Sequence, residues 1–271
     1  MENSAGIVMT GVRIVSASCD AAAVIAELGT EGWRAGARVI KRGDRGMVAA
    51  GALMALGGRE VVVKTHRLRG MREVVAAALG RSRLARQARG AALLEAAGVE
   101  TARVELVARG TDARGRRTEL LVLDRVRGVS VAHHAHRRDL SEIDRRALAH
   151  DLGAQIQSIA VAGLMNRDHK ASNIVVGRDG DGVPMPVVVD TVGVRRSHPA
   201  AARVRMLFGL TIELVGLGIL PAMTDRMRVV RAAVGDGREA RKRAWRAVDA
   251  LVRIHGDATP KDDPVRDPEE G

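Results

Sequence analysis

Short apolar runs separated by glycine-containing turns predict strands in the first half of the chain. The runs lie at residues 37–40, 47–50, 59–64, 104–107 and 119–123. The first three are separated by a turn containing Gly43 and Gly46 and by a pair of glycines, so residues 38–64 predict an antiparallel meander of three strands. A helical pattern over residues 81–97, followed by Gly98, comes before the last two strands. Five strands and one inserted helix predict a small α+β lobe.

The second half of the chain predicts helices around a short polar loop. Ser141 begins a capping box, and apolar residues then recur at helical spacing as far as Gly163. A charged loop over residues 165–173 follows. Two β-branched runs come after it, and the second ends at Asp190. Residues 199–254 predict further helices.

These patterns divide the chain into four segments. They are an N-terminal lead at 1–36 with one strand and a short helix, an N-lobe at 37–124, a helical C-lobe at 125–256 and an acidic, Pro-rich tail at 257–271. The tail composition is typical of disorder. The longest apolar run, residues 206–223, borders on the length of a membrane span. Because Glu213 interrupts it, a buried helix is the favoured interpretation.

Charge and composition narrow the classes of partner. The 271 residues carry a net charge of +12, which favours anionic partners such as a nucleotide, a phosphorylated glycolipid or a membrane surface. With no Tyr, one Phe and two Trp, the chain lacks the aromatic platforms that single-stranded nucleic acid requires, which argues against nucleic acid as the partner.

The cysteine and histidine residues restrict the possible functions less than the charge does. The lone Cys19 excludes an internal disulfide framework and a cysteine zinc site, and it suits a reducing compartment. No signal-peptide pattern is visible at the N-terminus, so we expect a cytoplasmic protein. His133, His134 and His136 form a polar cluster in an expected loop. Without a carboxylate or cysteine at ligand spacing, solvated side chains are favoured over a metal site there.

The polar loop carries the residue types that phosphoryl transfer needs. Asp168, Lys170 and Asn173 lie within six positions, between a helical run and a strand. A carboxylate can accept the proton of an attacking hydroxyl, a cation can neutralise the transferring phosphoryl group, and an amide oxygen can bind Mg²⁺. Asp190 ends the next strand, where a hairpin brings it near Asn173. Lys64 ends the third strand of the meander.

The ordered set resembles the protein-kinase-like superfamily. Residues 166–173 (N-R-D-H-K-A-S-N) resemble the catalytic loop H-R-D-L-K-x-x-N, residues 61–64 (V-V-V-K) resemble V-A-I-K, and residues 189–193 (V-D-T-V-G) resemble the D-F-G segment. Within that superfamily the chain is most similar to bacterial lipopolysaccharide kinases of the Kdo/WaaP type. Residues 188–196 (V-V-D-T-V-G-V-R-R) resemble that family's I-D-L-D-G-V-R-R segment, and residues 94–101 resemble its L-x-x-x-G-I-P-T stretch. The resemblance implies an α+β, two-lobed kinase-like fold with the active site in the cleft.

The resemblance also implies a role for each candidate residue. The roles are Asp168 as the base, Lys170 at the γ-phosphoryl group, Asn173 and Asp190 as Mg²⁺ ligands, Lys64 at the α- and β-phosphates, Gln87 as its partner, Gly43 and Gly46 in the turn covering the nucleotide, and Leu123 in the hinge that holds adenine. Three departures bear on activity. Asn166 replaces the His of the loop, Gln87 replaces a Glu, and Val192 replaces the second Asp of I-D-L-D-G.

The resulting hypothesis is a Mg-ATP-dependent kinase. Its expected acceptor is a hydroxyl of a lipopolysaccharide-core sugar or similar anionic glycolipid, approached through peripheral contact with the inner membrane surface. The absence of an A-P-E segment and of a long activation loop favours such an acceptor over protein. The alternatives are a pseudokinase that serves as a binding or scaffold protein, a small Ser/Thr protein kinase, and a basic nucleic-acid-binding protein.

Overall fold

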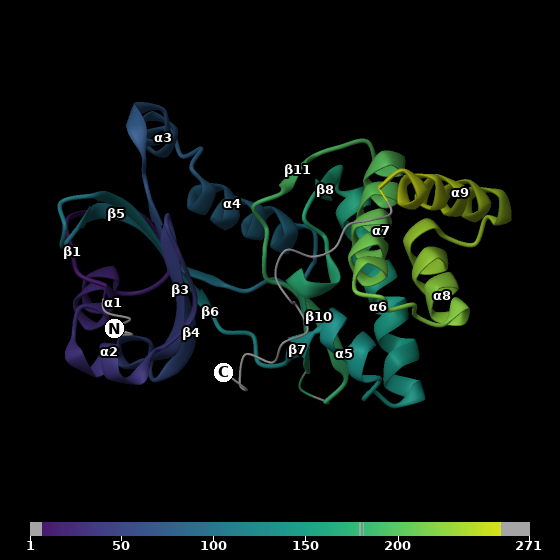
Figure 1. Cartoon of the computed structure of the whole chain (residues 1–271), viewed down its shortest axis with the longest axis horizontal. Helices are drawn as coiled ribbons and strands as arrows, with labels where there is room; N and C mark the ends of the chain where they lie inside the picture. Colours follow the sequence, from purple (N-terminus) through teal and green to yellow (C-terminus); the bar gives the residue numbers. More distant parts are fainter. Residues whose placement is uncertain (1–6, 179, 181, 256–271) are drawn as a thin grey trace. The chain divides into compact units, whose positions relative to one another are not determined.

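The computed structural model describes residues 7–178, 180 and 182–255. The chain divides into two compact units. The first comprises residues 1–91 and 102–125, and the second comprises residues 92–101 and 126–271. The C-terminal tail expected at 257–271 lies outside the described residues. Each unit is described separately (Figure 1).

A six-stranded antiparallel sheet forms the framework of the first unit. Its order is β1-β5-β6-β4-β3-β2. The strands are β1 (Met9–Ala17), β2 (Arg38–Gly43), β3 (Gly46–Leu53), β4 (Arg59–Arg67), β5 (Val104–Asp112) and β6 (Arg117–Asp124). The expected meander corresponds to β2, β3 and β4. The sheet has one strand more than the five expected, because β1 of the presumed lead pairs with β5.

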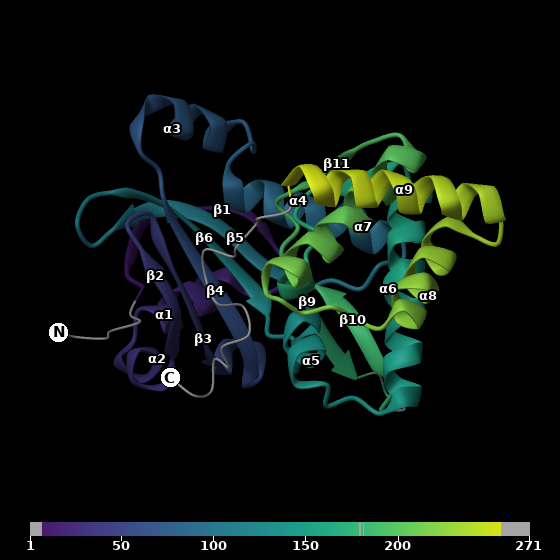
Figure 2. The ribbon, with the colours of Figure 1, turned by 45° about the vertical axis from the view of Figure 1, so that its right-hand side comes forward.

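Two short helices of the presumed lead cover one face of this sheet (Figure 2). Asp20 caps α1 (Ala21–Leu28) by accepting hydrogen bonds from two backbone amides of its first turn. Trp33 of α2 (Glu31–Gly36) is 4% exposed and packs with the apolar side chains of β3, β4 and β6. Burial of this size stabilises a fold by about 1.5–3 kcal/mol for each large apolar side chain. Residues 9–36 therefore belong to the core of the first unit.

Two further helices follow β4. They are α3 (Gly70–Ala78) and α4 (Arg83–Ala96), and a short 3₁₀ turn, η1 (Met54–Leu56), lies between β3 and β4. The division between the units falls within α4. Gly98 follows this helix with a φ of 70°, the left-handed conformation expected of a C-terminal glycine.

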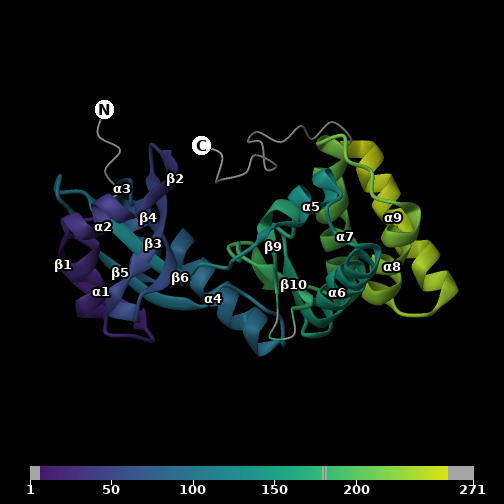
Figure 3. The ribbon, with the colours of Figure 1, turned by 90° about the horizontal axis from the view of Figure 1, so that it is seen from below.

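Helices dominate the second unit, with two small sheets beside them. The helices are α5 (Val131–Arg137), α6 (Glu142–Val161), α7 (Pro199–Gly216), α8 (Met223–Val234) and α9 (Arg238–His255). One sheet has the order β10-β9-β7, from β7 (Val129–Ser130), β9 (Ile174–Arg178) and β10 (Pro184–Val188). The other pairs β8 (Leu164–Asn166) with β11 (Val194–Arg196). Figure 3 shows α6, α7, α8 and α9 packed side by side.

Two expectations concern this helical unit. His133, His134 and His136 lie on α5 and not in a loop, because Ser130 caps a helix there by accepting a hydrogen bond from the His133 amide. His133 is 5% exposed, so the expectation of solvated side chains is wrong for it. No group of three metal-ligating side chains occurs in the part of the chain that the structure describes. Within the apolar run at 206–223, α7 ends at Gly216, and none of the described helices is long and apolar enough to cross a membrane.

Candidate active site

Asn166 anchors the polar loop from its first position. It is 1% exposed at the end of β8. Its Nδ2 donates a hydrogen bond to the backbone oxygen of Asp190 at 3.0 Å, and its Oδ1 accepts one from the Asp168 amide at 3.1 Å. One short amide side chain thus joins the loop to the segment after β10. The replacement of the expected His leaves the loop anchored.

The next residues turn tightly around Asp168. Its backbone oxygen accepts hydrogen bonds from the Lys170 amide and from Nδ2 of Asn173, both at 2.9 Å. Its side chain is 29% exposed, and the nearest cation, Nη2 of Arg167, is 3.5 Å away. The backbone of Asp168 is therefore held in place, and its carboxylate is partly open to a reacting group. Lys170 is exposed.

Strand pairing brings Asp190 to the same place. β10 and β9 are antiparallel, and the Val189 amide donates to the Asn173 backbone oxygen at 3.0 Å. Asp190 follows at once, and its Oδ1 accepts a hydrogen bond from the Val192 amide at 3.2 Å. Since Nδ2 of Asn173 is bonded to the loop, its Oδ1 remains as an acceptor. An amide oxygen and a carboxylate are hard oxygen ligands, so these two side chains have the chemistry that Mg²⁺ prefers.

Gly193 makes room for this arrangement. A Cβ atom at this position would lie 2.7 Å from Oδ2 of Asp168 and 2.9 Å from Oδ1 of Asn166. Both distances are shorter than real Cβ contacts, so any larger residue would displace the carboxylate. The sequence places this glycine in the segment that resembles D-F-G, but only the packing shows why it must lack a side chain.

Glu213 binds the loop through two hydrogen bonds. It lies on α7, is 8% exposed, and accepts hydrogen bonds from Ser172 through both oxygens. The Ser172 amide donates at 2.8 Å and the Ser172 hydroxyl at 2.6 Å. Such bonds to a carboxylate are among the stronger ones in proteins. Sequence reasoning treated Glu213 only as an interruption of an apolar run. A lone acidic residue on a buried helical face was the signal it missed.

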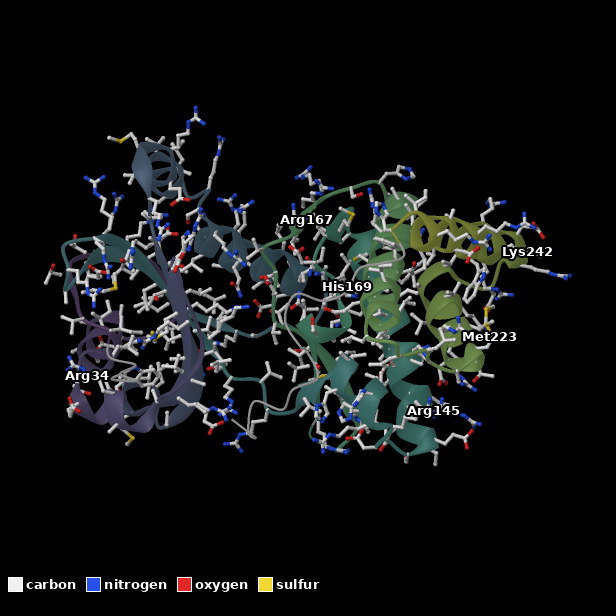
Figure 4. All side chains as sticks on the ribbon, viewed as in Figure 1. Arg34, Arg145, Arg167, His169, Met223 and Lys242 are labelled. Carbon is white, nitrogen blue, oxygen red and sulfur yellow. The ribbon has the colours of Figure 1, made fainter. Side chains whose placement is uncertain are left out.

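His169 is a buried neighbour of the presumed base, also missed by the sequence reasoning. It is 0% exposed, and neither ring nitrogen has a hydrogen-bond partner among the described residues (Figure 4). Burial lowers the pKa of His169 to about 4, because the charged imidazolium would lose its hydration there. The side chain is therefore neutral at physiological pH.

The first unit contains the other part of the candidate set. Nζ of Lys64 on β4 donates to Oε1 of Gln87 on α4 at 3.3 Å, and Gln87 is 3% exposed. The expected pair therefore forms. Leu123 is buried on β6 opposite Val62. Lys64 and Gln87 are together in this unit, whereas Asp168, Asn173 and Asp190 are together in the other.

The two glycines of the β2–β3 turn differ from each other. A Cβ on Gly46 would lie 1.9 Å from the backbone oxygen of Thr65, so a glycine is required there for β3 to approach β4. A Cβ on Gly43 would meet nothing within 4 Å. Strand packing is sufficient to explain Gly46. A part for either glycine in covering a nucleotide stays a prediction.

The fold defines a class. A six-stranded antiparallel sheet with helices in one unit and a mainly helical second unit make an α+β, two-lobed kinase-like fold. A solved structure described as WaaP in complex with acyl carrier protein matches it with a TM-score of 0.58, at 16% sequence identity, over 82% of this chain and 88% of that chain. At this identity the likeness concerns the fold. No family model matches the chain, and no curated protein matches it.

Proposed function

We propose that the protein is a Mg-ATP-dependent kinase that phosphorylates a hydroxyl of a lipopolysaccharide-core sugar or a similar anionic glycolipid. One observation carries the proposal. Asn166 hydrogen-bonds to the backbones of both Asp168 and Asp190, and Asn173 is bonded to the same loop. These bonds join the backbone of the loop to that of the segment after β10, which supports a site in which two carboxylates and an amide oxygen serve phosphoryl transfer.

Each residue of this group has a distinct part in the reaction. Asp168 accepts the proton of the acceptor hydroxyl as its oxygen attacks the γ-phosphorus, while the bond from that phosphorus to the β–γ bridging oxygen breaks and ADP leaves. Lys170, which is exposed and follows two residues later, neutralises charge on the transferring group. Asn173 and Asp190 would hold Mg²⁺, which would stabilise the negative charge of the phosphate groups.

Lys64 and Gln87 provide the nucleotide contact of the first unit. The ammonium group binds the α- and β-phosphates of ATP as a point charge. Gln87 orients it through its amide oxygen, 3.3 Å away. A neutral partner holds a lysine less strongly than a carboxylate would, but it also leaves the full positive charge for the phosphates. Gly43, Gly46 and Leu123 complete the proposed nucleotide site.

The acceptor class rests on charge. A net charge of +12 raises the local concentration of anionic molecules and favours approach to an anionic membrane surface. A phosphorylated or carboxylated sugar would be attracted by this field, whereas a neutral sugar would not.

Two assays test the proposal. In a thermal shift, ATP with Mg²⁺ is expected to raise the melting temperature of the wild type, and Asp190→Ala is expected to lose the metal-dependent part of that shift. In a phosphate-transfer assay with a lipopolysaccharide-core acceptor, Asp168→Ala is expected to bind Mg-ATP but to transfer about 10²–10⁴-fold more slowly. The matched control is Asp236→Ala, at a carboxylate that is 79% exposed. Wild-type turnover in the Asp168 variant would contradict the proposal.

A pseudokinase is the second candidate, favoured by the uncharged partner of Lys64. Gln87 cannot form the ion pair that many active kinases use to place this lysine. The same assays separate the two functions. Binding of Mg-ATP by the wild type without transfer to lipopolysaccharide, other glycolipids or protein would favour the pseudokinase.

A further inference from the structure

A hollow of about 480 Å³ lies in the first unit, where the ends of several strands meet. It is lined by the start of β1, the β2–β3 turn, the end of β4 and the β5–β6 turn. Since β1 and β2 are the two edges of the sheet, the sheet must curl until both edges border one space. The hollow is thus the mouth of a partly closed barrel, a common place for ligands.

Arginines dominate its wall. We call it the arginine basin, after its six arginines: Arg34, Arg42, Arg45, Arg67, Arg114 and Arg116. Six of 16 lining residues are cations, whereas the whole chain has 44 lysines and arginines in 271 residues. The basin is therefore more basic than even this Arg-rich composition explains.

The basin lies on the opposite face of β4 from Lys64, although Gly43 and Gly46 of the proposed nucleotide site also line it. Side chains alternate between the two faces of a strand. On β4, Val61 and Val63 point into the core of the first unit, and Thr65 and Arg67 continue that face into the basin. Lys64 points to the opposite face, where it meets Gln87.

Carboxylates neutralise only part of the positive charge. Asp112 pairs with Arg116 at 2.7 Å, Glu73 with Arg45 at 3.5 Å, and Glu31 with Arg34 at 3.6 Å. In the described part of the chain, no carboxylate pairs with Arg67 or Arg114. Arg67 and Arg114 therefore leave positive charge around one concave space. Concave walls focus such a field.

One donor in the wall also lacks an acceptor. Nε of Arg34, on α2, is shielded from solvent and has no hydrogen-bond partner among the described residues (Figure 4). A buried donor without a partner costs free energy. An anion in the hollow would add a counter-charge for Arg34, whose pair with Glu31 at 3.6 Å is largely exposed.

We propose that the arginine basin binds a small polyanion that carries two or more phosphate groups. Guanidinium forks match phosphate oxygens in pairs. The volume suits a small molecule and is too small for a nucleic-acid duplex. The lining residues include no aromatic side chain, so the site recognises phosphates and not a stacked base.

The test uses inorganic tripolyphosphate as the probe, measured by calorimetry with EDTA at about 0.1 M salt so that no metal site contributes. Arg67→Ser/Arg114→Ser is expected to bind it about tenfold or more weakly than the wild type, through the lost charge-assisted bonds. The matched control is Arg243→Ser/Arg246→Ser, which removes the same charge from exposed positions of α9. That control is expected to stay within about twofold of the wild type, since neither Arg243 nor Arg246 lines the basin. Far-UV circular dichroism verifies that all variants are folded.

Several outcomes would overturn the proposal. They are no wild-type binding below about 1 mM, and equal weakening in the basin and control pairs. Binding of heparin or duplex DNA that tripolyphosphate does not displace would also overturn it, in favour of a macromolecular polyanion. Because the assay contains neither ATP nor Mg²⁺, a failure here would leave the proposed kinase function untouched, and a failure of that function would leave this result standing.

Discussion

His169→Leu should make the second unit markedly less sensitive to mild acid. The imidazole is fully buried beside the candidate base, and burial lowers its pKa to about 4 from 6.5. Below pH 6.5 the unfolded chain takes up a proton that the folded chain cannot accept, so stability falls as the pH falls. This loss of stability is absent above pH 6.5 and reaches its full size below about pH 4.

The size of the effect follows from the two pKa values. Each pH unit between the unfolded and folded pKa values of His169 corresponds to about 1.4 kcal/mol of stability. Complete protonation of the unfolded chain therefore lowers the free energy of unfolding by roughly 3 kcal/mol. At about pH 5 most of it, roughly 2 kcal/mol, is already lost. Leu cannot take up a proton, so the variant escapes this loss. It also removes two buried nitrogens without partners, so it should be at least as stable as the wild type at neutral pH.

Urea unfolding provides the measurement. In a Trp33→Phe background, Trp245 on α9 is the only tryptophan, so its fluorescence follows the second unit. The stability gap between His169→Leu and the parent should widen by roughly 2 kcal/mol from neutral pH to about pH 5. The control is His150→Leu, at a side chain that is 69% exposed, which should show no comparable change. A gap of the same size at both pH values would refute the reasoning.

Three further predictions concern the site. Gly193→Ala places a methyl group within 2.7 Å of the candidate base and should lower phosphate transfer by about 10²-fold or more without unfolding the chain. Glu213→Gln keeps the shape but weakens both bonds to Ser172, so kcat should fall by about tenfold with KM for ATP little changed. Gln87→Glu supplies a charged partner for Lys64 and should raise kcat/KM for ATP severalfold, by fixing the ammonium group more firmly.

Each of these has its own control. Gly36→Ala meets nothing within 4 Å and should leave transfer unchanged, so equal losses in both glycine variants would contradict the packing argument. Ser172→Ala should match Glu213→Gln if the carboxylate acts through the loop, and unequal pH profiles for the two would argue for a direct role of the carboxylate. For Gln87→Glu, a fall in kcat/KM would show that the uncharged partner is the better one.

Much of the second-unit site follows from the sequence, because its cues are local. Asp168, Lys170 and Asn173 lie in one loop, and the β-branched run before Asp190 predicts the strand that delivers it. A hairpin needs few residues to bring its ends together, so spacing alone places Asp190 near Asn173. Lys64 and Gln87 came from a resemblance of motifs, and the structure brings them to hydrogen-bond distance.

Other features depend on contacts between distant segments. The presumed lead at 1–36 contributes β1, α1 and α2 to the first unit, because β1 pairs with β5 across about ninety residues of chain. Its short apolar patterns predicted the strand and helix but not their partners. The histidines on α5 illustrate the opposite error, in which a polar composition suggested a loop although Ser130 caps a helix.

The sequence by itself determined the kinase-like order of strands, loop and helices, and the identity of the residues that could carry phosphoryl transfer. The tertiary structure alone decided that Glu213 grips the loop, that Gly193 must lack a side chain, that His169 is buried and neutral, and that arginines from four separate segments surround one hollow. Hydrophobic periodicity and motif spacing report the local chain. Burial, close approach and charge clustering are properties of segments far apart in sequence, and they arise only once the chain has packed.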